Sequence, residues 1–111
     1  MAIRTIQFYK HYFNEFFANQ TSQVRKKITQ TLVWIQEVDR LPLSIFRSIE
    51  GVKGLFEIRV EVGSNIFRIF CCFDKGKIVV LFNAFQKKTQ KTPQKEIEKA
   101  ERLMKEYFDT K

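Results

Sequence analysis

The chain has 111 residues, of which 44% are hydrophobic and 14% aromatic, including 12 phenylalanines. This composition supports a packed core and excludes a disordered basic tail, and the length predicts one domain over residues 1–111. Twenty Lys and Arg against 12 Asp and Glu give a formal charge of +8, which favours RNA, DNA or an acidic protein as a partner. Because no apolar run reaches the roughly 18 residues of a membrane span and no secretory signal is visible, we expect a soluble, cytoplasmic protein with no membrane partner.

The N-terminal part of the chain predicts one strand followed by two helices. Residues 3–8 are a short strand candidate, and residues 9–19 repeat aromatic side chains at helical spacing. His11, the only histidine, falls on this helix, and we expect it at the edge of the core. Thr21 or Ser22 can cap a second helix that ends before Pro42, and its apolar stripe consists of Val24, Ile28, Leu32, Ile35 and Val38.

After a loop with Gly51 and Gly54, the pattern changes to the alternation of strands. Residues 55–62 alternate apolar and mostly charged side chains, Gly63-Ser64 suits a type II′ turn, and residues 66–73 form the next strand. Cys71 and Cys72 are neighbours on that strand, so they point to opposite faces and cannot readily bridge. We interpret them as small buried hydrophobes, since a metal or redox site would need further ligands at a workable spacing.

The C-terminal part predicts another strand and a last helix. Asp74-Lys75-Gly76 turns the chain into a strand over residues 77–85, and residues 93–108 form an amphipathic helix with Ile97, Ala100, Met104, Tyr107 and Phe108 on its apolar side. The resulting order is β-α-α-β-β-β-α, an α+β fold.

A pair of arginines follows from the register of the first hairpin. A two-residue turn pairs Val62 with Asn65 and places Arg59 directly across from Arg68. Opposed like charges destabilise a strand pair by up to about 1 kcal/mol, so we interpret the two arginines as a clamp for a phosphate. The alternative is that Glu57 and Glu61 neutralise them diagonally on a solvated face.

The second turn leaves the face of the following strand ambiguous. A three-residue Asp-Lys-Gly loop, which Gly76 slightly favours, puts Phe82, Ala84 and Gln86 on the arginine face. A two-residue loop instead puts Asn83, Phe85 and Lys87 there. Phe85 therefore has both a core and a base-stacking interpretation, of which core is favoured.

Lysines gather where the last strand leads into the last helix. Lys87, Lys88 and Lys91 precede a helix start that Thr92 and Pro93 are predicted to cap. Unpaired backbone N–H groups and the positive end of the helix dipole favour phosphate there. Nothing in the sequence supports a Ser-His-Asp or Cys-His set or a metal nuclease, so any reaction would use Arg, Lys, Glu or Tyr.

Three segments in order resemble the phage-related HigB branch of the RelE-type toxins. These are G-L-F-E-I-R-V at Gly54 to Val60, F-R-I-F at Phe67 to Phe70, and F-Q-K-K-T-Q-K-T-P from Phe85 followed by E-I-E-K-A. The resemblance implies a small antiparallel sheet with two N-terminal helices and a C-terminal helix. It also implies the toxin of a type II toxin–antitoxin module, a ribosome-dependent endoribonuclease that cuts translated mRNA and is silenced by a HigA-like helix-turn-helix antitoxin in a hetero-oligomer.

The chemistry implied by the resemblance is attack of a ribose 2′-hydroxyl on the adjacent phosphate, without metal or other cofactor. Arg59 and Arg68 match the family's strand arginines and would stabilise the transition-state charge, and Lys87 and Lys88 match its paired lysines, one of which would act as acid or base. Glu57 is the other candidate base. Some relatives carry a catalytic histidine, aspartate or tyrosine near the end of the last strand or the C-terminus. This chain has Asn83, Ala84 and Gln86 at that strand end and only Tyr107 as a C-terminal counterpart. The candidate RNA-binding residues are Phe85, Lys91, Thr92 and Lys95.

Two other functions stay open on the sequence. ParE-like proteins resemble this fold and inhibit DNA gyrase by binding, without nuclease activity. A plain nucleic-acid-binding module would share the basic charge but would be harmless when overexpressed.

Overall fold

The computed structural model describes residues 2–88 and 90–111. The α+β class is confirmed, and the described residues form five strands and three helices: β1 (Thr5–Phe8), α1 (Tyr12–Ala18), α2 (Ser22–Glu37), β2 (Phe46–Ser48), β3 (Phe56–Val62), β4 (Asn65–Asp74), β5 (Ile78–Lys87) and α3 (Gln94–Asp109). The predicted order lacks β2, because three residues are too few for an alternating pattern to show. None of the helices in the described ranges is long and apolar enough to cross a membrane.

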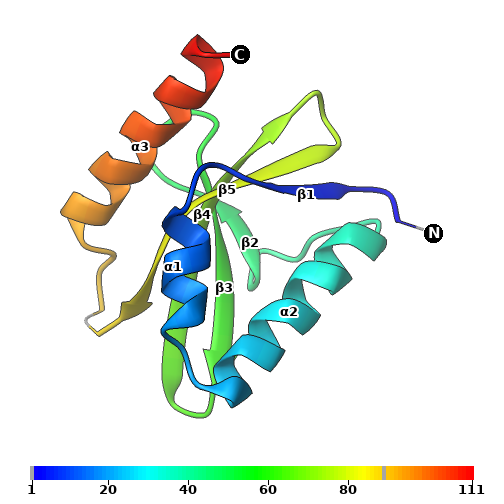
Figure 1. Ribbon diagram of the computed structural model, residues 1–111, viewed down its shortest axis with the longest axis vertical. Helices are drawn as coiled ribbons and strands as arrows, with labels where there is room; N and C mark the ends of the chain where they lie inside the picture. The colour runs from blue at the N-terminus through cyan, green and yellow to red at the C-terminus, as the bar shows by residue number, and fades with distance from the viewer. Residues whose placement is uncertain (1, 89) are drawn as a thin grey trace.

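The five strands form one sheet in the order β1-β5-β4-β3-β2. Neighbours from β2 to β5 are antiparallel, as the resemblance implies, and β1 adds to the edge by pairing with β5 in parallel. No hairpin joins β1 to β5, and therefore no turn imposes an antiparallel direction. Figure 1 shows the sheet between the two N-terminal helices and α3.

The sheet has a separate core on each face. Under α1 and α2, the fully buried Ile28 and Ile35 pack against strand residues that include Cys71. Under α3, Leu103 packs on Phe70 and its neighbours, among them Cys72. The two cysteines are free and buried on opposite faces, as predicted. Desolvation raises the pKa of Cys72 to about 12.

The register of the first hairpin is confirmed. Val62 pairs with Asn65 and Arg59 with Arg68, so a two-residue turn at Gly63-Ser64 joins β3 to β4. Gly63 has a φ of 60° and Ser64 has no positive φ, which agrees with the predicted type II′ turn.

The second hairpin differs from both predicted loops. Three residues, 75–77, separate the paired Asp74 and Ile78, and a bulge sets Phe82 and Asn83 of β5 against the single residue Phe70 of β4. The loop and the bulge together bring Phe85 across from Arg68 and Lys87 across from Ile66. The favoured assignment of Phe82, Ala84 and Gln86 to the arginine face is therefore wrong for the part of β5 that faces Arg68. Phe85 and Lys87 lie on that face instead.

The helix starts follow the sequence in one case and depart from it in the other. The Thr21 hydroxyl accepts a hydrogen bond from Val24 N at 3.3 Å, so the predicted cap of α2 is confirmed. In α3 the N-cap is Pro93, without a side-chain hydrogen bond, and the predicted capping by Thr92 is wrong. The first turn of α3 is held by Asn83 instead, whose Nδ2 donates to both the carbonyl and the Oε1 of Glu96.

Candidate functional site

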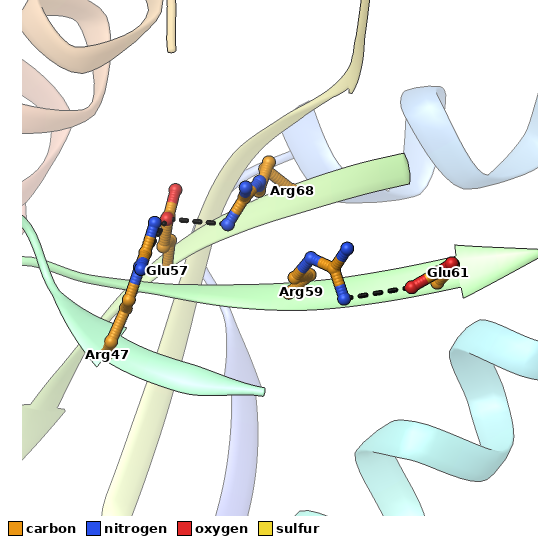
Figure 2. Close-up of polar contacts among 5 residues, drawn as sticks. All are labelled: Arg47, Glu57, Arg59, Glu61 and Arg68. Carbon is orange, nitrogen blue, oxygen red and sulfur yellow. Dashed lines mark hydrogen bonds and ion pairs between the residues drawn. The ribbon is translucent and has the colours of Figure 1, made fainter. Parts of the chain in front are cut away.

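Charged side chains from three neighbouring strands meet on the face of the sheet that carries α3. The helix packs over β4 and β5 and leaves the part near β2 and β3 to these side chains. Pairing places Arg47 across from Glu57 and Arg59 across from Arg68. Figure 2 shows Arg47, Glu57 and Arg68 in a row across β2, β3 and β4, with Arg59 farther along β3. We call Arg47, Glu57, Arg59 and Arg68 the arginine cluster.

The centre of the cluster is a buried ion pair. Arg68 Nη1 lies 2.7 Å from Glu57 Oε1, and the two side chains are 5% and 3% exposed. The same carboxylate oxygen accepts from Arg47 Nε at 3.3 Å. Burial lowers the pKa of the Arg68 guanidinium, the charges of Arg47 and Arg59 lower it further, and Glu57 opposes the shift.

The buried pair leaves two polar atoms unsatisfied. Among the described residues, neither Glu57 Oε2 nor Arg68 Nε has a hydrogen-bond partner. An unsatisfied buried polar group costs about 1–3 kcal/mol, and native proteins keep few of them. These two atoms lie in residues that line a surface pocket, which makes the cluster a candidate functional site.

The two arginines of the hairpin are each paired with a carboxylate, as in the alternative interpretation, but the pair of Glu57 with Arg68 is buried rather than on a solvated face. Glu57 reaches Arg68 diagonally across the strands, and Arg59 Nη1 lies 2.9 Å from Glu61 Oε1. This pairing offsets the repulsion between Arg59 and Arg68. The region still has a formal charge of +1, because with Arg47 it contains three arginines and only two carboxylates.

Lys87 adds a fourth cation to this region. Its pKa is lowered first by desolvation and then by the charge of Arg68, with further contributions from Arg47 and Arg59. Lys87 and Lys88 line a groove of about 510 Å³ with Ser64, Ile66 and Gln90, next to the turn between β3 and β4. The sequence-predicted Glu57, Arg59, Arg68 and Lys87 are thus brought together, with Lys88 at their margin.

The remaining predicted residues do not line the two pockets beside the arginines. The segment leading to α3 carries Lys91 and Thr92, and Lys95 is exposed on the first turn of the helix. The pockets beside the arginines are lined by other described residues. Phe85 is half-buried and stacks on Phe70 with ring centroids 5.7 Å apart, which agrees with its core interpretation. Thr89, part of the resembling motif, lies outside the described residues.

Tyr107 does not reach the cluster. Its hydroxyl donates to Asp74 Oδ2 at 2.6 Å, and this contact raises the pKa of Tyr107 to about 12. Asp74 lies six residues beyond Arg68 on β4, which corresponds to about 20 Å of extended strand. A catalytic counterpart at Tyr107 is therefore wrong. His11, with 61% of its side chain exposed, is the N-cap of α1 and lies beside Glu15 and Tyr12.

Arg47 is the site residue that sequence reasoning does not find. It lies on the three-residue β2, where Phe46 points into the core and Arg47 to the opposite face. The I-F-R-S segment before Gly51 contains this alternation, but only the pairing of β2 with β3 shows that Arg47 lies beside Glu57.

Comparison with known proteins identifies the family of this chain. The model of the family described as phage-derived protein Gp49-like (DUF891) matches residues 15–105, which is 91 of the 111 residues. A search of curated proteins found no match. The match covers the end of α1, all of α2, the strands of the arginine cluster and most of α3. The chain therefore belongs to the Gp49-like family, a RelE/HigB-type toxin family of toxin–antitoxin systems.

Proposed function

We propose that this toxin is an endoribonuclease that cleaves translated mRNA on the ribosome. The observation that carries the proposal is the convergence of Arg59, Arg68 and Lys87, from three different strands, beside a pocket and a groove. Guanidinium and ammonium groups held in place before the reaction stabilise the charge that develops on a phosphate during cleavage. Membership of a toxin family supports the same conclusion.

The reaction has three requirements. The ribose 2′-oxygen attacks the adjacent phosphorus and gives its proton to a water molecule, and the bond from phosphorus to the 5′-oxygen breaks. That 5′-oxygen takes up a proton, which leaves a 2′,3′-cyclic phosphate and a 5′-hydroxyl. In this proposal Arg68 and Arg59 stabilise the extra negative charge on the pentacoordinate phosphorus.

Protonation of the 5′-oxygen falls to the lysines. Lys87 is our general acid, because desolvation and the charge of Arg68 lower the pKa of its ammonium group, which makes the proton easier to donate. Lys88 lines the same groove and is the second candidate for the general acid. Glu57 is better suited to positioning Arg68 than to acting as a base, since one of its oxygens already accepts from two arginines.

The toxin family implies an antitoxin. We propose a HigA-like helix-turn-helix antitoxin whose acidic surface complements the +8 charge of the chain, in a cytoplasmic hetero-oligomer.

Lys87→Met tests the proposal, because it removes the ammonium group and keeps most of the aliphatic stem. Wild type and variant are induced without antitoxin, and the 5′ ends of cellular mRNAs are mapped. Loss of a general acid lowers cleavage by about 10²-fold or more, so the variant should neither cut mRNA nor arrest growth, while it still binds the antitoxin.

Lys26→Met, at an exposed position of α2, is the matched control and should behave as wild type. Equal mRNA cleavage by the Lys87→Met variant and wild type would remove Lys87 from the mechanism. Growth arrest with intact mRNA and a DNA-damage response would instead identify a gyrase inhibitor.

A further inference from the structure

A pocket of about 190 Å³ is lined by the arginine cluster and shares no lining residue with the groove of Lys87 and Lys88. Its charged lining is the four residues of the cluster. The remainder comes from the turn before β2, where Leu43, Ser44 and Ile45 face the same space. Leu43 is 76% exposed, the highest value among the exposed large hydrophobic side chains of the described residues.

Backbone hydrogen bonds hold this turn in place. Ile45 N and Phe46 N both donate to the Pro42 carbonyl, at 3.0 and 2.9 Å. The Ile45 carbonyl in turn accepts from Arg59 N at 2.8 Å, so the turn is fixed to the strand that carries Arg59. A ligand entering the pocket therefore meets a preformed wall, and binding does not have to order a loop.

The size and lining of the pocket narrow the class of ligand. The volume is below the about 300–1,000 Å³ of ordinary small-molecule sites, so it suits one ring system rather than a whole cofactor. A free phosphate would make no use of the leucine and isoleucine, and a purely apolar ligand would leave the arginines unsatisfied. A nucleotide combines a planar base with an anionic phosphate, and guanidinium groups also stack on planar rings.

We propose that this pocket receives one unpaired base of the RNA, next to the phosphate that Arg59 and Arg68 hold. The inference rests on the nuclease function proposed above. Leu43 and Ile45 contact the base from the turn, and Arg47, whose side chain is 57% exposed, contacts it from β2. Leu43 is then a residue that sets substrate preference without taking part in bond cleavage.

Binding of a non-cleavable RNA tests the base pocket separately from catalysis. The probe is a short single strand of 2′-O-methyl RNA, which cannot make the 2′-attack, and a set of probes in which one abasic nucleotide is moved along the strand. Fluorescence anisotropy gives the Kd for the full-length wild type, for Leu43→Ala and for the control Val33→Ala. Val33 is exposed on α2, which packs on the other face of the sheet.

One abasic position should weaken wild-type binding by about fivefold, at the lower end of what a stacked base contributes. Leu43→Ala should weaken binding of the intact probe by a similar factor. It should bind that abasic probe with the same Kd as wild type does, and Val33→Ala should match wild type with both probes. The inference is wrong if no abasic position matters, if the two losses multiply, or if wild type does not bind the probe. Cleavage of unmodified mRNA on ribosomes is scored separately, so a toxin that cuts RNA but ignores abasic positions disproves the pocket alone. If the abasic probe and Leu43→Ala weaken binding as expected but mRNA on ribosomes is not cleaved, the nuclease function alone is disproved.

Discussion

Glu57→Gln is the substitution whose effect follows most directly from the structure. The carboxylate is 3% exposed and is the counter-charge of Arg68, which is 5% exposed. Glutamine keeps the shape and one oxygen acceptor but removes the charge. Arg68 then stays buried as a cation without compensation, because a guanidinium does not deprotonate in proteins.

The expected loss of stability follows from burial. Removing one partner of a buried ion pair costs about 3–5 kcal/mol, and we expect about 3 kcal/mol because glutamine still accepts a hydrogen bond. The contact with the exposed Arg47 adds about 0–1 kcal/mol. For a chain of this length, about 1 kcal/mol changes Tm by about 4 °C, so we expect Tm to fall by about 12 °C.

Thermal and urea denaturation are measured for wild type, Glu57→Gln and a double variant. The comparison distinguishes the cost of an uncompensated buried charge from the loss of the contact between Glu57 and Arg68. The double variant, Glu57→Leu with Arg68→Met, removes both charges together, and buried pairs replaced in this way often retain their stability. We expect it to melt near wild type and to be inactive as a toxin. A Glu57→Gln protein that melts within about 2 °C of wild type would show that the pair is solvated, contrary to the reasoning above.

Two pH dependences follow from the shifted groups. If Lys87 is the general acid, the rate of cleavage of ribosome-bound mRNA falls as pH rises through the pKa of Lys87, which lies below 10.5. The Lys87→Arg variant should be slower and should show no such fall. A fall in rate at alkaline pH that persists in this variant contradicts the assignment. The pKa of Asp74 lies below its usual 3.8 because Lys111 and Tyr107 hydrogen-bond the carboxylate, so its contribution to stability is present above that value and is lost as pH falls through the folded-state pKa. Asp74→Asn should therefore lower Tm at neutral pH by more than in strong acid, and a difference in Tm that is the same at every pH would contradict this account.

The alternating strand and the short turn at Gly63-Ser64 were enough to predict that Arg59 faces Arg68, because a two-residue turn permits one register. The second hairpin could not be predicted in the same way. Its loop length and the bulge at Phe82 and Asn83 each change the face of the residues that follow, and local sequence does not specify the bulge. The position of Lys87 beside Arg68 depends on both.

The sequence by itself determined the three helices, the long strands, the charge of the chain and the pairing of two arginines, since all of these follow from local periodicity and turn chemistry. The tertiary structure decided which charges are buried together. Arg47 and Glu57 meet through the pairing of β2 with β3, and the turn at Leu43 adjoins Arg59 through a backbone hydrogen bond. Contacts between segments distant in the chain leave no periodic pattern, and therefore only the folded chain shows that a buried carboxylate, three arginines and a leucine line one pocket.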